Sequence, residues 1–204
     1  LINPAKAKEA SKGPHKPNSV HISSRAKVLK AISFESLWGN FLNGSASSFA
    51  LTQAEATSLI LDSIAEESTD GTKIDRATVE VEVKDYITLI EELSHGDLLK
   101  TIDFMSLCSS VLFLSEISIE TKADQLFAWI ALDPESSAFS FDDFFVAMKS
   151  FERGLSHAMG RVACSEAFVK SVATQWMALA DPQKKGSTDA QTRVSNNHFF
   201  EFCT

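Results

Sequence analysis

The chain has 204 residues, 44% of them hydrophobic, and a mean hydropathy of −0.02, which is typical of a globular protein with one domain or two small ones. Its longest apolar run, FMSLCSSVLFL at 104–114, is shorter than the roughly 18 residues of a transmembrane helix, so no transmembrane segment is expected. The formal net charge is −8, but the first 30 residues alone carry +6, which leaves −14 for the remainder.

Residues 1–24 are predicted to form an extended basic arm. The stretch KGPHKPNS contains Pro and Ser and has no hydrophobic periodicity. The arm could be a solvated tail, or a strap that lies on an acidic partner or membrane surface through Lys6, Lys8, Lys12 and Lys16. Because no aromatic residues are interleaved with these lysines, the sequence does not favour a nucleic-acid partner.

The first predicted helix follows the arm. Residues 25–42, RAKVLKAISFESLWGNFL, place apolar residues at intervals of four or five, and NGS then ends the pattern. We therefore expect a leading helix and a loop within 25–51. Thr52 opens the next helix, and Glu55 three residues later completes a capping-box signature.

The middle of the chain contains one ambiguous segment and one buried helix. In VEVEVKDYITLIEEL at 79–93, the valines alternate as in a strand, whereas the later apolar residues have helical spacing. Both interpretations remain open at its start. Residues 101–117, TIDFMSLCSSVLFLSEI, are apolar on most sides, which predicts a buried helix.

The last part of the chain is predicted to be helical as well. Thr121 begins a helix that ends at Asp133-Pro134, and a second helix runs from 141 to a C-cap at Gly154. SEAFVKSVATQWMALAD at 165–181 has the same character, and RVSNNHFFEFC predicts a final short aromatic helix.

The three cysteines, Cys108, Cys164 and Cys203, lie far apart and form no CxxC pair. A dispersed odd number argues against a disulfide scaffold or a zinc site, so we expect reduced core thiols and favour an intracellular reducing compartment. The chain begins at Leu1 rather than Met and shows no intact signal peptide, which favours a processed or truncated product.

An internal repeat follows the predicted turns. An apolar residue, a few polar residues, an acidic or polar residue and then an aromatic one recur in LLKTIDF (98–104), FSFDDF (139–144) and VSNNHF (194–199), and more weakly in VEVKDY (81–86). The chain thus alternates helix, polar turn and helix, and no regular sheet is implied.

This pattern resembles the EF-hand superfamily. In that motif a 12-residue loop between two helices supplies oxygen ligands from positions 1, 3, 5, 9 and 12, with Gly at position 6 and a bidentate Glu at position 12. An apolar residue at position 8 pairs with its counterpart in a second hand, and an aromatic residue usually follows the loop. The resemblance implies an all-α fold of paired helix–loop–helix units.

The best match to the motif lies at 133–144. The resemblance implies Asp133, Glu135, Ser137 and Asp143 as possible calcium ligands and Phe139 as the apolar residue of position 8. The loop is one residue short before Phe139, lacks the Gly, and has Asp in place of Glu. A shorter carboxylate reaches the ion less easily in bidentate fashion, so calcium affinity should be low.

The other loops depart further from the motif. Anchored on the aromatic residue at 104, Leu99 takes position 8 and Asp103 position 12. The last loop runs from Asp181 to Val194, six residues too long, and has His198 at position 12. These are interpreted as vestigial hands.

The arrangement is similar to the two paired hands of calcineurin-B-like and neuronal-calcium-sensor proteins, with one pair in 52–117 and one in 121–204. Such pairs can expose an apolar groove that grips an amphipathic helix. The resemblance implies a non-catalytic scaffold subunit that contacts a partner protein, either a helix or a larger assembly. Trp129 and Trp176 are candidate anchors, together with the basic arm. The alternative is a calcium sensor that uses the loop at 133–143; no cofactor besides calcium is suggested.

An enzyme is not favoured. The sequence contains no GxSxG, no HExxH, no P-loop and no glycine-rich dinucleotide turn. The five histidines are scattered, with no Cys or carboxylate at metal-ligand spacing.

Overall fold

The computed structural model describes residues 21–44, 48–67, 75–94, 101–130, 138–180 and 193–195. Helices dominate this part of the chain, so the predicted all-α class is confirmed. In chain order the elements are η2 (Ser24–Ala31, a 3₁₀-helix), α1 (Phe34–Asn43), β1 (Ala50–Leu51), α2 (Gln53–Glu67), α3 (Arg76–Leu93), β2 (Ile102–Asp103), α4 (Phe104–Leu114), α5 (Ile119–Ile130), β3 (Ala138–Ser140), α6 (Phe141–Met159), α7 (Glu166–Ala180) and β4 (Arg193–Ser195). No helix in these described ranges is both long and apolar enough to cross a membrane.

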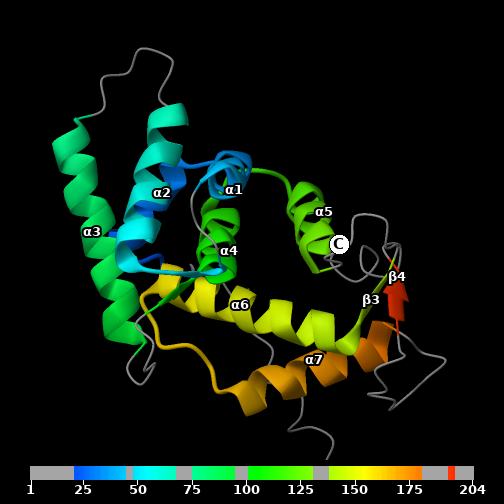
Figure 1. Ribbon diagram of the computed structural model, residues 1–204. Coiled ribbons are helices and arrows are strands. Elements are labelled where there is room, and N and C mark those ends of the chain that lie inside the picture. The colour runs from blue at the N-terminus through cyan, green and yellow to red at the C-terminus, as the bar shows by residue number, and fades with distance from the viewer. Residues whose placement is uncertain are drawn as a thin grey trace, which may run out of the picture.

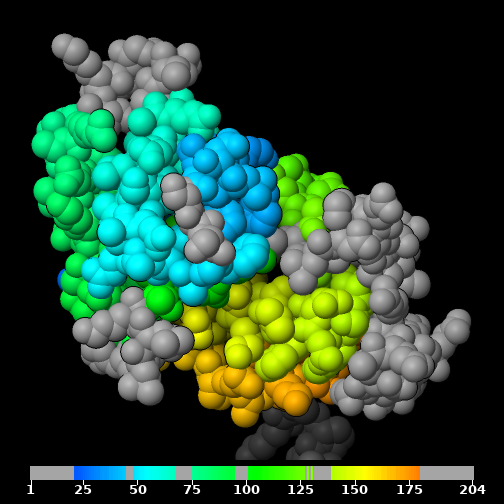
Figure 2. All heavy atoms as spheres, in the orientation of Figure 1, coloured from blue at the N-terminus to red at the C-terminus, as the bar shows by residue number. Residues whose placement is uncertain are grey.

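The helices form two lobes joined by α6 (Figure 1). The first lobe contains η2 and α1 to α4, and the second contains α5, β3, α7, β4 and the N-terminal half of α6. The C-terminal half of α6 crosses beneath α4 and contributes Ala158 to the core of the first lobe. In the space-filling view, α6 runs along the boundary between the first lobe and α7 (Figure 2).

The single leading helix predicted for 25–42 is wrong, because the structure divides it into η2 and α1. Ile32 and Ser33 between them are extended, with φ of −123° and −83°. The side chain of Ser33 accepts a hydrogen bond from the backbone N–H of Ser36 at 3.1 Å and so caps α1. Because an N-cap residue has an extended rather than a helical backbone, η2 cannot continue through Ser33 into α1. Helix α1 alone therefore leads into the loop before α2.

Two local predictions around α2 and α3 have clear outcomes. The capping box at the start of α2 is confirmed: Glu55 Oε2 accepts from the Thr52 N–H at 2.7 Å, and Thr52 Oγ1 accepts from the Glu55 N–H at 3.2 Å. The ambiguous valine segment is helical throughout, in α3. Val83 is buried and Val81 exposed, because only the former shares the inward face with the buried Ile87 and Ile90.

The predicted C-cap at Gly154 is also wrong. Helix α6 continues to Met159 and ends at Gly160, whose φ of +69° is the left-handed conformation that favours glycine at a helix end. Gly154 instead marks the closest approach of α6 to α4. A Cβ atom there would lie 2.2 Å from the backbone oxygen of Ser106, so any side chain larger than hydrogen would force α6 and α4 apart.

The expectation of core thiols holds for one cysteine. Cys108 is buried in α4, and burial raises the pKa of its thiol well above the usual range. Cys164 is exposed, which contradicts the expectation; it lies in the connection between α6 and α7, where its backbone N–H donates to Glu152 Oε1 at 2.9 Å. Cys203 lies outside the described residues.

Candidate functional site

Two short antiparallel ribbons join segments that lie between or next to the helices. Strand β1, before α2, pairs with β2, before α4, and Leu51 faces Ile102 in this ribbon. Strand β3, before α6, pairs with β4, and Phe139 faces Val194. Each ribbon therefore holds together two segments that are far apart in the sequence.

The second ribbon brings together the two apolar residues that were assigned to position 8 of their loops, Phe139 and Val194. The first ribbon corrects the assignment at 98–104. The residue paired with Leu51 is Ile102, not Leu99, which lies outside the described residues. Asp103 is consequently the N-cap of α4 rather than a residue inside its first turn.

The side chain of Asp103 is committed to two structural contacts. Its Oδ1 accepts from the backbone N–H of Met105 at 3.0 Å, which satisfies a free donor at the start of α4. Its Oδ2 accepts from the Ser150 hydroxyl on α6 at 2.7 Å. This carboxylate thus fastens the first ribbon to the helix that joins the lobes.

Asp143, the one predicted calcium ligand that lies within the described residues, also forms a helix cap. Its Oδ2 accepts from the Ser140 N–H at 3.0 Å and from the Ser140 hydroxyl at 2.6 Å, while Ser140 Oγ accepts from the Asp143 N–H at 3.2 Å. Glu55 makes the same reciprocal pair with Thr52 in the other lobe, and these hydrogen bonds lower the pKa of Glu55. After β1 and after β3, the carboxylate in the first turn of the following helix therefore accepts hydrogen bonds from the N-cap residue of that same helix.

The fit to calcium can be judged for one of the four predicted ligands. Asp133, Glu135 and Ser137 lie outside the described residues. The ion takes six to eight oxygen ligands, and the described part of the loop supplies one carboxylate, that of Asp143, which is already hydrogen-bonded. Across the described ranges, no three His, Cys, Asp or Glu side chains cluster closely enough to hold a metal ion. The described residues do not by themselves form a calcium site.

Of the candidate partner-binding residues, Trp176 is the one whose side chain the structure describes. Trp176 on α7 is half-buried and stacks on Phe144 with 4.5 Å between ring centroids, so it is part of the core of the second lobe. Trp129 belongs to α5, but its side chain is outside the described part of the structure. Lys6, Lys8, Lys12 and Lys16 also lie outside the described residues.

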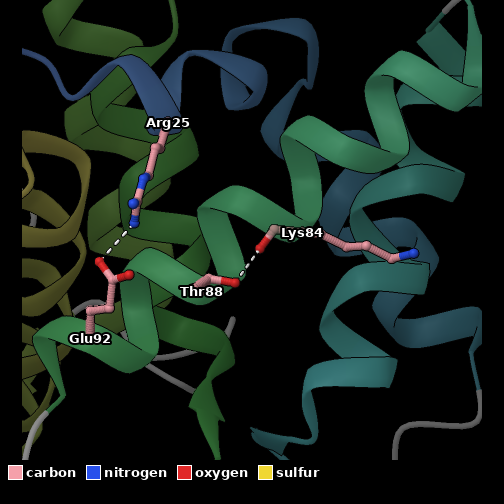
Figure 3. Close-up of polar contacts among 4 residues, drawn as sticks. All are labelled: Arg25, Lys84, Thr88 and Glu92. Carbon is pink, nitrogen blue, oxygen red and sulfur yellow. Dashed lines mark hydrogen bonds and ion pairs between the residues drawn. The ribbon is translucent and has the colours of Figure 1, made fainter.

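Sequence reasoning missed a groove in the first lobe. A cavity of about 550 Å³ lies between η2 on one side and α2 and α3 on the other, and Ile64 and Val79 contribute its apolar wall. Glu82 and Asp85 of α3 face the basic side chains of η2 across it, and farther along α3 the side chain of Arg25 reaches Glu92. Figure 3 shows this pair beside the neighbouring turn of α3, where Thr88 Oγ1 donates to the Lys84 carbonyl at 2.9 Å. The sequence feature that pointed toward η2, though not toward the acidic wall of the groove, was the alternation of basic and apolar residues in RAKVLKA.

The second lobe exposes apolar side chains on α7 and on the connection that leads to it. Phe168 is 56% exposed and Leu179 62%, and Val162 in the preceding connection is 69% exposed. Single exposed apolar residues are common on protein surfaces, so each alone indicates nothing. Phe168 and Leu179 are eleven residues apart, about three helical turns, and therefore lie along one side of α7.

Comparisons with protein-family models, curated proteins and solved structures find no match to this chain.

Proposed function

We propose that this protein is a non-catalytic EF-hand-like binding or scaffold subunit whose loops serve structure rather than metal binding. It would contact a partner protein through an apolar groove, with the basic arm adding contacts to an acidic surface. The partner would be an amphipathic helix or part of a larger assembly.

The observation that carries the proposal is the combination of paired loops and occupied carboxylates. Phe139 with Val194 and Leu51 with Ile102 keep the apolar pairing that holds two loops together. Asp143 and Glu55, each in the first turn of the following helix, accept capping hydrogen bonds with one carboxylate oxygen each. Such a loop retains its apolar pairing, but its carboxylate accepts hydrogen bonds from the following helix. It is therefore better suited to fixing the angle between helices than to sensing an ion.

The alternative, a calcium sensor, depends on the loop at 133–143. The carboxylate of Asp143 lies at the end of this loop, shortly after strand β3, and the resemblance assigns it a ligand role. Calcium binding there would have to displace or share the hydrogen bonds from Ser140, which would weaken the start of α6.

Calorimetric titration of the full chain with calcium, repeated with magnesium, separates the two functions. For a scaffold subunit we expect no binding heat and no shift in melting temperature at millimolar calcium. Micromolar binding that disappears in Asp133→Ala would overturn the scaffold proposal and support a sensor. Asp142→Ala is the matched control, because Asp142 is exposed, adjacent to Asp143 and not among the predicted ligands.

A further inference from the structure

The 3₁₀-helix η2 packs on the first lobe through its apolar side chains. Ala26, Val28 and Leu29 are 0%, 8% and 0% exposed. Ala26 and Leu29 are three residues apart, and a 3₁₀-helix has three residues per turn, so these two side chains lie on one side of η2. All three residues belong to the core of the first lobe, where η2 contacts α3, α4, α2 and α6.

The other side of η2 is basic and lies near an acidic helix. Lys27 and Lys30 are exposed, and Arg25 Nη1 contacts Glu92 Oε2 at 2.7 Å. Both members of this pair are substantially exposed, with side chains 40% and 51% accessible. An exposed ion pair adds little to stability, so this charge pair orients η2 on α3 without holding it there firmly.

The fit of η2 to the groove is incomplete. Runs of 3₁₀-helix longer than three or four residues are uncommon, because their hydrogen bonds are poorly aligned, and η2 has eight residues. The cavity of about 550 Å³ lies along it, lined by Val28 and Ala31 and by Ile64 and Val79 opposite. An α-helix is wider than a 3₁₀-helix and would fill more of this space.

From these observations we propose that η2 is an intramolecular ligand that occupies the partner groove of the first lobe. A partner helix that replaces it would be basic and amphipathic, with apolar residues every three or four positions facing α2 and α3. Exchange between η2 and the partner would control whether the groove is open. This inference rests on the proposed function only in assigning the groove to a partner protein, and the calcium titration does not bear on it.

The decisive variant is Arg25→Glu in the full chain, which places two carboxylates together without changing a buried residue. We would measure binding of a fluorescently labelled peptide of residues 21–33 by anisotropy. The wild-type chain should bind it weakly, because its own η2 fills the groove, and Arg25→Glu should bind it about three- to fivefold more tightly. Hydrogen exchange should rise in η2 while α4 stays protected.

The matched control is the double variant Arg25→Glu/Glu92→Arg. It restores an opposite-charge pair within the chain and sets the introduced guanidinium on α3 against the arginine of the peptide, so peptide binding should return to the wild-type level or below. Equal peptide affinity in wild type and Arg25→Glu, with unchanged exchange in η2, would overturn the proposal. Dimerisation of Arg25→Glu without peptide binding would also overturn it, because the groove would then belong to a second copy.

A second pair of variants tests whether η2 can leave without unfolding the lobe. Leu29→Asp places a carboxylate on the buried side of η2, whereas Leu42→Asp makes the same change at a position of α1 that is 66% exposed and does not line the groove. We expect Leu29→Asp to release η2 and bind the peptide while α4 remains protected from exchange, and Leu42→Asp to behave as wild type. Loss of protection in α4 of Leu29→Asp would identify η2 as a permanent part of the core and refute the exchange.

Discussion

Each lobe contains a short two-stranded ribbon, β1 with β2 in the first and β3 with β4 in the second, but the lobes differ in how their described cores are filled. Among the described residues, the core of the first lobe contains 23 buried hydrophobic residues, including three from η2 and Ala158 from α6. Within the described residues, the core of the second contains seven, all from α5, β3, α6 and α7. Hydrophobic burial is the main favourable term in folding, so we predict that the described part of the first lobe is the more stable of the two.

The predicted difference in stability between the two lobes is tested most strongly by truncating one buried phenylalanine in each lobe. Phe104 stacks on Phe41 with 3.8 Å between ring centroids, and Phe144 stacks on Trp176 at 4.5 Å. Truncating a buried Phe to Ala costs about 3–5 kcal/mol. We expect Phe104→Ala to lower the global free energy of unfolding by that amount. Phe144→Ala should instead open the second lobe locally while the first stays folded.

Denaturant unfolding combined with hydrogen exchange measures both effects. In Phe144→Ala, amides of α7 should exchange quickly while those of α4 keep their protection. The control is Phe168→Ala, which removes an exposed ring from the same lobe and should change stability little. If Phe144→Ala and Phe104→Ala both exposed α4 to the same degree, the lobes would form one cooperative unit and the comparison would fail.

The sequence allowed much of the fold to be predicted, because helices are specified locally. The periodicity of 53–67, the capping box of Thr52 and Glu55 and the buried character of 104–114 all lie within single elements. The errors arose where another element decides the outcome. Gly154 was interpreted as a helix end because glycine favours one, yet its role is to let α4 approach α6.

The candidate site was harder to predict than the fold. Phe139 and Val194 could be matched to each other, because each stands at the same place in the repeated pattern, shortly before an aromatic residue. The register at Ile102 was missed, since Asp103 resembles a loop-ending ligand as much as an N-cap until its strand partner is known. The groove beside η2 could not be predicted, because its acidic wall is in α3, far from η2 in the sequence.

Acid should weaken the junction between α6 and the first lobe through His157. This side chain is 3% exposed and, in the described structure, its Nδ1 has no hydrogen-bond partner. Burial, together with the charge of Arg153 and opposed by Glu152, lowers the pKa of His157 to about 4 from the usual 6.5. The folded state therefore favours the neutral imidazole. As the pH falls below 6.5 the unfolded chain binds a proton first, and stability is lost until about pH 4.

The expected loss between these pH values is about 3 kcal/mol, measured as the free energy of unfolding in urea at about pH 7 and pH 4. Capping carboxylates such as Asp75 and Glu55 have lowered pKa values and also weaken the fold in acid, so the comparison must be with a variant. His157→Gln should lose about 3 kcal/mol less than wild type over this range. His21→Gln is the control, because His21 is exposed and should leave the pH profile unchanged. Identical profiles in all three chains would show that the imidazole is not buried at this junction.

The smallest of the three effects concerns the crossing that joins the lobes. In Gly154→Ala the new Cβ would lie 2.2 Å from the Ser106 oxygen and 2.7 Å from Ser109 Cβ, so α6 must move away from α4. Overpacking of this kind costs about 1–3 kcal/mol, and part is recovered because alanine favours a helix by about 1 kcal/mol. We expect a net loss of up to about 2 kcal/mol in the free energy of unfolding.

Gly39→Ala in α1 separates the crossing from helix propensity. A Cβ there would meet nothing within 4 Å, so the substitution should raise the free energy of unfolding by about 0.5–1 kcal/mol. If denaturant unfolding shows that Gly39→Ala raises and Gly154→Ala lowers the free energy of unfolding, the destabilisation by Gly154→Ala arises at the contact between α6 and α4. Ser110 makes the contact specific, since its hydroxyl lies 2.8 Å from the Gly154 carbonyl and accepts from Tyr86 at 3.1 Å. A gain of stability in both variants would mean that α6 can move freely on α4, and the second lobe would then lack the rigid connection that this crossing gives it.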